Sequence, residues 1–556
     1  MLKGHPKGLL VAFFANMGER FGFYTMMSIL VLFLQAKYGL TGAKAGFIYS
    51  NFYMSIYLLS LVGGIMADRF LGMGKTITMG IVMMAVGYVL IAIPGLGLYP
   101  VCGGLLVIAL GNGLFKGNLQ AVVGNLYEPK QYAHLRDSAF SLFYMGINVG
   151  ALFAPTAAVK IRDYMLGLRG FNYNGDLPAK CHRLIEGASI DTNNFQQLAN
   201  EASKNTDMVT DLQAFATQYI DAFSTGYNYA FGFAAVMMGV SLFVYFAFNK
   251  HLKPGFAVPT VTSETGEELP DMPKAEIKER LIALGLVFAV CIFFWMSFHQ
   301  NGLTINFFAR DYVHQTAGPN TFFWFDITVL LPIFGAAVGA YMMFNRENTS
   351  KQKIIGLAMA AGLGILGYIQ YSGLSEANKI SPETFQHLNP FFIIALTPIV
   401  MAIFAALAKR KKEPSTPKKI GFGMLITTLG FALLLIASLG LSSQADLGMT
   451  GAPADMRVTP YTLVGVYFIL TIAELFISPM GLSFVSKVAP PKMKGTMQAG
   501  WLCATAAGNG LLFIGGILYD SAELWMLWGF FIVCCLMSAA FIFGILKRLE
   551  RVTSNS

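Results

Sequence analysis

Apolar segments of about 20 residues recur along the whole chain, separated by short polar loops. A segment of that length spans the roughly 30 Å of hydrocarbon in a bilayer, and backbone groups in lipid must bond within their own segment, so each one predicts a helix. Alternating ten-residue strands, which would indicate a membrane barrel, are absent. The pattern predicts an all-α polytopic membrane protein with about fourteen transmembrane helices. The segments are 9–34, 46–66, 77–93, 99–114, 140–159, 229–248, 282–308, 322–344, 354–369, 390–407, 420–441, 461–485, 500–517 and 524–546.

Composition and charge agree with this class. Hydrophobic residues make up 55% of the 556 positions and charged residues only 12%, too apolar for a water-soluble core. The net charge of +9 comes from Lys and Arg in alternate loops, the bias left by membrane insertion, so we expect no nucleic-acid partner. This bias places both termini in the cytoplasm, and we expect a plasma-membrane protein, in bacteria the inner membrane.

Two polar segments divide the chain. Residues 160–226 are predicted to lie outside, where 194–217 carries apolar residues at helical intervals, and 250–281 reads as a cytoplasmic linker. The expected domains are a six-helix bundle over 1–249 and a second bundle over 282–549, followed by a cytoplasmic tail at 550–556. A hairpin at about 321–373 is extra to the second bundle, and we expect it to pack on the lipid face. The division resembles the major facilitator superfamily, in which substrate binds midway between two bundles.

The first apolar segment carries a polar stripe. Asn16, Glu19, Arg20, Phe23 and Tyr24 follow the spacing i, i+3, i+4, i+7 and i+8, so they share one helix face. Charges inside a membrane helix are expensive and normally face a partner, a cavity or a substrate. The stripe therefore predicts either one wall of a polar cavity or a structural ion pair.

Two further charges lie in apolar segments. Lys116 falls near the end of the fourth segment, where snorkelling to the interface is an alternative, and Glu474 lies thirteen residues into another. If the bundles face each other, cations stand on one side and a carboxylate on the other. A peptide zwitterion carries the matching charges at its two ends.

Several motifs agree on a family. The chain resembles the proton-coupled oligopeptide transporters, the POT family, over nearly its whole length. The resemblance rests on Glu19-Arg20-Phe21 with Tyr24, Phe115-Lys116-Gly117-Asn118, Phe143-Tyr144-Met145-Gly146-Ile147-Asn148, Trp295 with Gln300, Leu388-Asn389-Pro390, Glu474-Leu475 with Ser478-Pro479-Met480-Gly481, and Trp501.

The resemblance implies a set of roles. Arg20 and Lys116 would hold the peptide carboxylate, while Glu474 and Asn148 would hold the amino end. The implied pocket also includes Tyr24, Tyr57, Asn389, Trp295, Ser478 and Trp501, although aromatic residues are also common as packing or lipid-facing groups. Glu19, Glu474 and His299 are the candidates for proton coupling. Asp68 and Arg69 in the loop after the second segment, and Asp311 after the seventh, are the candidates for gating.

The chain departs from the family pattern at several of these places. Asn16 and His299 stand where the family has carboxylates, and Phe23 stands for a tyrosine. Met27 stands for the arginine that closes an external gate on Asp311, so the gate needs another partner and Asp311 is expected to be a solvated helix end. Lys116 loses its acidic partner, and either the substrate satisfies it or neutral His299 accepts its hydrogen bond.

The expected function is import of di- and tripeptides by proton symport through alternating access. The alternative is a transporter of an amino-acid-like, modified peptide or anionic solute with altered coupling. We expect no enzyme, because the polar groups are dispersed and no phosphate loop, metal-spaced cluster or Ser/His/Asp context occurs. No cofactor or metal is expected beyond the proton gradient as driving force. The expected partners are small peptides and membrane lipid, and the protein is expected to be a monomer.

Overall fold

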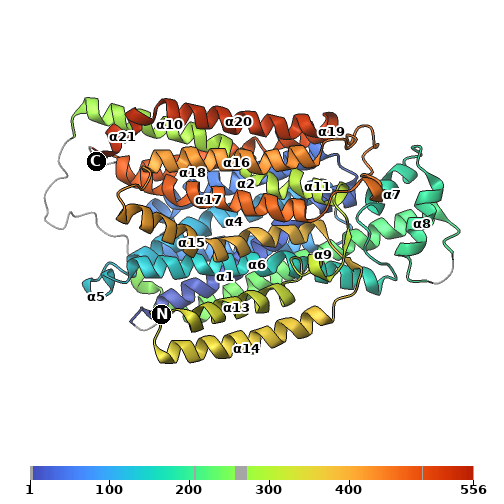
Figure 1. The fold of residues 1–556 in the computed structure, drawn as a ribbon, viewed down its shortest axis with the longest axis horizontal. Helices are drawn as coiled ribbons and strands as arrows, with labels where there is room; N and C mark the ends of the chain where they lie inside the picture. The colour runs from blue at the N-terminus through green and yellow to red at the C-terminus, as the bar shows by residue number, and fades with distance from the viewer. Residues whose placement is uncertain (1–3, 206–207, 257–271, 491–492, 555–556) are drawn as a thin grey trace.

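The computed structural model of the protein describes residues 4–205, 208–256, 272–490 and 493–554. Long helices run side by side, and both chain ends lie at the same end of the molecule, on the left in Figure 1. We call this the terminal end. The opposite end carries the short helices α7 (Leu177–Ile185) and α8 (Thr192–Ala202), and we call it the insertion end.

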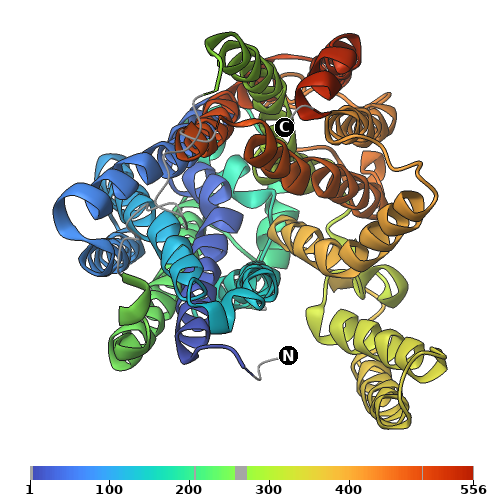
Figure 2. The same ribbon diagram turned by 90° about the vertical axis from the view of Figure 1, so that its left-hand side faces the viewer.

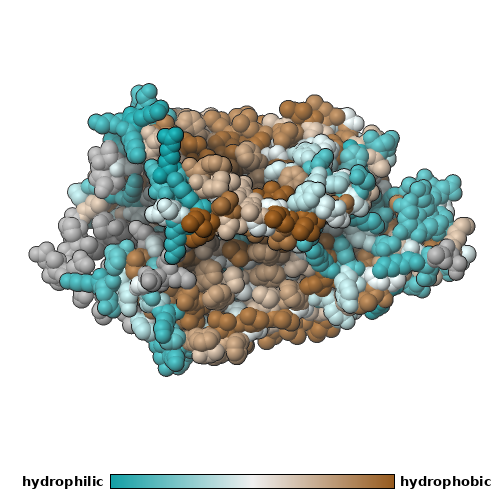
Figure 3. Space-filling view, turned by 60° about the horizontal axis from the view of Figure 1, so that its bottom comes forward, coloured by the Kyte–Doolittle hydropathy of each residue, from teal (hydrophilic) through white to brown (hydrophobic). Residues whose placement is uncertain are grey.

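Fourteen helices of the described residues are long and apolar enough to cross a membrane, which confirms the predicted number. A band of hydrophobic surface separates two polar ends in the space-filling view (Figure 3). Since apolar side chains facing outward are stable only in lipid, the chain is a multi-pass membrane protein. The first half contains α1 (Lys7–Tyr38), α2 (Gly42–Ile65), the π-helical turn η1 (Met66–Leu71), α3 (Met73–Ala92), α4 (Leu98–Asn125), α5 (Lys130–Ala133), α6 (Arg136–Leu168) and α9 (Leu212–Phe248).

The helices that flank the external segment are longer than the sequence predicts. α6 continues to Leu168 and α9 already begins at Leu212, so only 169–211 stand outside these two helices. Arg162, expected in the loop, therefore lies within α6. The predicted helix over 194–217 is divided between α8 and the start of α9. We call residues 169–211 the insertion.

The linker is also shorter than expected. The 3-10 turns η2 (Asn249–His251) and η3 (Lys253–Phe256) follow α9, and α10 (Lys274–Phe298) begins eight residues before the predicted boundary at 282. Residues 257–271 lie outside the described part of the chain.

Two helices of the second half are broken. The seventh segment comprises α10, the 3-10 turn η4 (His299–Gly302) and α11 (Thr304–Asp311). The thirteenth comprises α18 (Lys494–Gly510) and α19 (Phe513–Ser521). The remaining elements are β1 (Thr316–Ala317), α12 (Pro319–Phe322), α13 (Ile327–Phe344), α14 (Ser350–Ser372), β2 (Asn378–Lys379), η5 (Pro382–His387), α15 (Leu388–Lys409), α16 (Thr416–Ala437), η6 (Ala454–Met456), α17 (Tyr461–Val488), α20 (Leu524–Gly544) and α21 (Leu546–Ser554). β1 and β2 pair antiparallel, Thr316 opposite Lys379.

The extra hairpin is formed by α13 and α14 and lies at the edge of the molecule, outside the two bundles (Figure 2). α13 touches the second bundle, where the rings of Phe334 and Phe391 stand 5.3 Å apart. α14 buries only Gly356 and Gly367. The hairpin therefore lies at the periphery of the second bundle, and its packing on the lipid face stays a prediction.

Glycine allows close helix packing in the first bundle. A Cβ added at Gly63 would stand 2.1 Å from the carbonyl oxygen of Gly113, so α2 and α4 approach at a distance only glycine permits. Gly64 has nothing within 4 Å of an added Cβ. Close approach of α2 and α4 therefore requires glycine at 63 and not at 64.

Candidate functional site

Glu19 and Arg20 form a buried ion pair on α1. Nε and Nη2 of Arg20 donate to the two carboxylate oxygens of Glu19 at 2.5 and 2.6 Å, and the residues are 0% and 3% exposed. Nδ2 of Asn112 on α4 donates to the same carboxylate at 2.7 Å. The Arg20 guanidinium also lies 4.7 Å from the ring centre of Phe23. Each charge is thus compensated before any substrate arrives.

Lys116 lies inside α4, not near its end as the sequence suggests. The helix continues for more than two turns beyond Lys116, to Asn125. The Lys116 side chain therefore does not snorkel to the interface from a helix end. The ammonium lies 4.7 Å from the ring centre of Tyr57 and close enough to Arg20 and Glu19 to interact electrostatically. No carboxylate of the described residues stands within 4 Å of it.

Glu474 lies inside α17 of the second bundle. Nδ2 of Asn389 at the start of α15 donates to its carboxylate at 2.9 Å and to Thr471 at 3.1 Å. Tyr24 and Tyr57 each interact electrostatically with both Arg20 and Glu474. The two tyrosines therefore lie near both the Arg20 guanidinium of the first bundle and the Glu474 carboxylate of the second.

The two broken helices meet at their breaks. Nδ1 of His299 lies 2.5 Å from Oδ1 of Asn509, at the end of α18, and Nε2 lies 3.2 Å from the Tyr53 hydroxyl on α2. Gln300 donates to the Leu512 carbonyl at 3.2 Å. The rings of Trp295 and His299, four residues apart, are stacked with their centres 4.8 Å apart. The hydrogen bond considered between Lys116 and His299 is not formed, because both ring nitrogens of His299 already bond to Tyr53 and Asn509.

Other predicted pocket residues have local contacts. Asn148 donates to the Tyr144 carbonyl of its own helix at 3.3 Å. Trp501 is buried against Gly481, where an added Cβ would stand 1.8 Å from the indole. The Trp295 indole N–H and the Ser478 hydroxyl are buried without a protein partner among the described residues, so they are free to bond a ligand or water.

The predicted gating residues divide into two groups. Asp68 and Arg69 are exposed in η1, and no ion pair joins them to another described residue. Asp311 is 4% exposed, so the expectation of a solvated helix end is wrong. Nε and Nη2 of Arg310 and the Tyr519 hydroxyl all donate to it, at 2.6, 2.8 and 2.7 Å.

Hydrogen bonds between described residues join the bundles over part of their length. The cross-bundle hydrogen bonds that the structure describes lie at the level of Tyr53 and His299 or nearer the insertion end. Examples are Ser50 to the Gly510 carbonyl at 2.9 Å and Arg310 to Gln35 at 2.7 Å. The charged groups on α1, α4 and α17 lie on the side of this seal toward the terminal end, as in a transporter closed at one end.

Sequence reasoning missed several of these residues. Asn112 is the one polar amide in the predicted apolar segment 99–114 and lies one turn before Lys116, a signal that was available. Tyr53 and Asn509 carried no distinguishing signal, because a lone tyrosine or asparagine in an apolar segment is common. No group of three or more described His, Cys, Asp or Glu side chains is arranged to hold a metal.

Opposed charges between two membrane bundles define a polytopic transporter. A family model described as POT family matches residues 74–265 and 369–520, and the chain belongs to that family. It is 26% identical over 584 residues to the peptide transporter YePEPT of Yersinia enterocolitica, which covers all of this chain and 96% of that protein. It is 25% identical over 517 residues to the dipeptide and tripeptide permease B of Salmonella typhimurium, 90% of this chain and 84% of that one.

Solved structures share the fold. A crystal structure of a POT peptide transporter in complex with sulfate superposes with a TM-score of 0.68 at 23% identity, over 99% of this chain and 96% of that one. A crystal structure of a POT family transporter in complex with 5-aminolevulinic acid superposes with a TM-score of 0.66 at 19% identity. The match covers 100% of this chain and 98% of that one. The fold is therefore the helical transporter fold expected from the sequence.

Proposed function

We propose that this protein imports di- and tripeptides by proton symport through alternating access. The observation that carries the proposal is the placement of Arg20 and Lys116 on one bundle and Glu474 on the other, with Tyr24 and Tyr57 near both Arg20 and Glu474. A short peptide presents a carboxylate and an ammonium at opposite ends, and pairing both offsets the cost of removing them from water. Relatives named peptide transporters and peptide permeases support the same cargo.

Lys116 is the first contact for the peptide carboxylate, because no described carboxylate neutralises it. Arg20 is engaged by Glu19 and becomes available when that carboxylate is protonated. Protonation of Glu19 therefore favours substrate binding, which couples the proton to the peptide. Asn112 keeps Glu19 in place in both protonation states, since its amide can bond to a carboxylate or a carboxylic acid.

Glu474 is the second proton candidate and the partner of the peptide ammonium. Asn389 provides its described hydrogen bond, so an incoming ammonium meets a carboxylate that has remaining acceptor capacity. Release of the peptide toward the terminal end is favoured when Glu19 gives up its proton there and pairs with Arg20 again, because the peptide carboxylate then loses one of its two cations. His299 remains a third candidate, and its neutral hydrogen bonds make it the weakest of the three.

We further propose that the protein lies in the bacterial inner membrane with both termini cytoplasmic, since basic residues gather in the loops of the terminal end. One chain contains both charge groups, so we propose that it works as a monomer. No cofactor is needed, because the proton gradient supplies the driving force.

The test is uptake of a labelled dipeptide into proteoliposomes with and without an inward proton gradient. We expect accumulation only with the gradient, and the same peptide without label should compete. Uptake that ignores the gradient would contradict the coupling, and a failure to take up any dipeptide would contradict the peptide as cargo.

A Glu474→Gln variant sharpens the test. The glutamine amide can still accept the hydrogen bond from Asn389, but it cannot be protonated as a carboxylate can. Gradient-driven accumulation is therefore expected to fall by about 100-fold, the scale at which proton-transfer residues act. Exchange of peptide across the membrane without a gradient should continue at a higher peptide concentration, because the amide oxygen still accepts from the peptide ammonium but carries no charge. Glu376→Gln, a substitution at an exposed carboxylate of the same half, is the matched control.

A further inference from the structure

A second buried ion pair joins the bundles at the insertion end. Nη1 of Arg162 on α6 lies 2.5 Å from Oε1 of Glu383 on η5, and both side chains are 0% exposed. The Tyr227 hydroxyl donates to the same oxygen at 2.6 Å, and Nη2 of Arg162 donates to the Ser381 hydroxyl at 2.9 Å. The carboxylate of the second half is therefore held entirely by groups of the first half among the described residues.

The insertion is attached to this pair. The ring of Tyr173 lies 3.9 Å from Cζ of Arg162, and the Tyr173 carbonyl accepts a hydrogen bond from Lys379 of the second half at 3.2 Å. Asp163, whose side chain is 40% exposed, accepts from Arg162 at 2.8 Å within α6. Arg162 thus has a second carboxylate available if the first one moves away.

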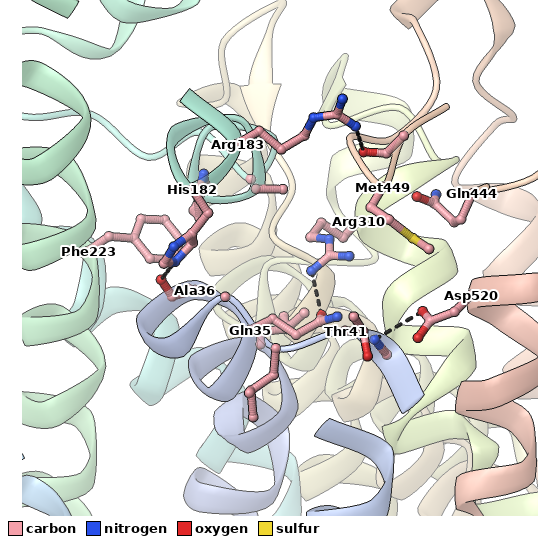
Figure 4. A pocket seen from close by; sticks show the side chains of 18 of the residues that line it. Gln35, Ala36, Thr41, His182, Arg183, Phe223, Arg310, Gln444, Met449 and Asp520 are labelled. Atoms are coloured by element: carbon pink, nitrogen blue, oxygen red, sulfur yellow. Dashed lines mark hydrogen bonds between the residues drawn. The ribbon is translucent and has the colours of Figure 1, made fainter. Parts of the chain in front are cut away.

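The insertion also forms an outer set of contacts with the second half. Nη2 of Arg457 donates to both carboxylate oxygens of Asp176 at 2.8 Å, and Gln315 donates to one of these oxygens at 3.0 Å. Arg183 on α7 donates to the Gly448 carbonyl (Figure 4). Beneath α7 lies a cavity of about 340 Å³ whose lining includes Arg310 and Asp520 (Figure 4). The insertion therefore covers the path between the bundles and is bonded to both.

Asp311 does not supply a cross-bundle ion pair. Its carboxylate is satisfied by Arg310 and Tyr519, which belong to its own half, and Met27 on α1 offers no charge. The cross-bundle ion pairs at this end are instead Arg162 with Glu383 and Asp176 with Arg457.

We propose that these two ion pairs and the insertion form a two-layer gate that must separate in each transport cycle to admit solute from the insertion end. The inference rests on the proposed alternating access. As the gate opens, Arg162 stays with Asp163 on its own helix while water reaches Glu383, so neither charge is left bare in a dry interior. The insertion then moves with the first bundle, to which it is covalently attached at both of its ends.

The first experiment cross-links the outer layer of the gate, which is the pair Asp176 and Arg457. Cysteines replace Asp176 and Arg457, and a short reducible bifunctional thiol reagent links them, in a background where the native cysteines other than Cys181 are removed. Cys181 is buried, which raises its pKa to about 12 and keeps its thiol protonated near neutral pH. Linking is expected to abolish dipeptide uptake, and reduction to restore it.

The matched control is the pair Arg169→Cys and Asp221→Cys, linked by the same reagent. These residues also form an Arg–Asp contact, at 3.4 Å, but both belong to the first half. Linking them should leave uptake unchanged. Full uptake by the protein linked between 176 and 457 would overturn the proposal.

A second experiment needs no substrate, so it separates failure of the gate from failure of the proposed cargo. Asn306 on α11 is 1% exposed and donates to the Ser28 carbonyl of α1 at 3.4 Å, beneath the gate. Labelling of an Asn306→Cys variant by a hydrophilic maleimide should become roughly tenfold faster when Glu383→Gln is added, a population shift of about 1.4 kcal/mol. Adding Glu376→Gln should change nothing. An unchanged labelling rate with Glu383→Gln would show that the pair does not hold the gate.

Discussion

His299 forms a hydrogen bond through each of its ring nitrogens, and the one through Nε2 crosses to the first bundle. With the proton on Nδ1, a neutral imidazole donates to Oδ1 of Asn509 and accepts the Tyr53 hydroxyl at Nε2. No carboxylate bonds to the ring, and Lys116 lies near enough to repel a positive charge. The contacts therefore suit a neutral bridge better than a proton carrier, although histidine is the residue whose ordinary titration suits proton transfer.

A His299→Gln variant distinguishes these roles. The glutamine amide can also donate to one neighbour and accept from the other, but it cannot titrate. We expect dipeptide uptake to keep the pH dependence of the unaltered protein, with a rate within about tenfold, since a single rearranged hydrogen bond is worth roughly 0.5–1.5 kcal/mol. The measurement is initial uptake at a series of external pH values. Loss of the pH dependence would instead make His299 a proton carrier.

Sequence reasoning located the charges of the site but not their partners. The stripe on α1 follows from helical spacing alone, and Glu474 stands out because a carboxylate in an apolar segment is rare. The hydrogen bond from Asn112 to Glu19 joins residues 93 positions apart, and the one from Tyr53 to His299 joins residues 246 apart. Such pairs depend on how helices are arranged around one another, which the period of a single helix does not contain.

At the scale of the elements, helix ends and breaks differ most from expectation. Arg162 was assigned to a loop because hydropathy falls after residue 159, yet α6 continues for more than two further turns. Its charge is compensated by Glu383 from the other half, a partner that hydropathy does not reveal. The breaks at His299–Gly302 and after Gly510 were likewise hidden, because each segment is apolar on both sides of its break. The peripheral hairpin was predictable because an inserted helix pair preserves the orientation of all later helices.

If the hairpin of α13 and α14 is peripheral, disturbing its packing should leave transport unchanged. A Cβ at Gly339 on α13 would stand 2.6 Å from the Ala360 nitrogen of α14, so Gly339→Leu must push the two helices apart. We expect a loss of about 1–3 kcal/mol in stability, seen as a lower melting temperature in detergent, with uptake per folded molecule unchanged. Gly362→Leu on α14 is the control, because nothing lies within 4 Å of its added Cβ. A large loss of uptake in folded Gly339→Leu protein would contradict the peripheral role.

At the scale of the whole molecule, charge and access are both asymmetric. Basic residues gather in loops at the terminal end, whereas the described cross-bundle bonds lie toward the insertion end. If the terminal end faces the cytoplasm, the structure is closed to the outside and its charged site lies on the cytoplasmic side of the seal. This is the state from which a peptide would be released.

Orientation is tested by labelling intact cells with a membrane-impermeant thiol reagent. Thr192 at the start of α8 and Lys412 in the loop after α15 are both exposed but lie at opposite ends. In a background without reactive cysteines, Thr192→Cys should be labelled in intact cells and Lys412→Cys only after permeabilisation. The reverse pattern would invert the proposed topology.

The partners of Glu383 also bear on how the chain is made. Both described groups that bond its carboxylate, Arg162 and Tyr227, belong to the first half. During synthesis the first half leaves the ribosome before the second. Arg162 can pair with Asp163 of the same helix, so its charge is compensated before the second half has been synthesised. When the second half inserts, Arg162 is already present to pair with Glu383. This order of synthesis compensates a carboxylate for which the second half provides no described partner.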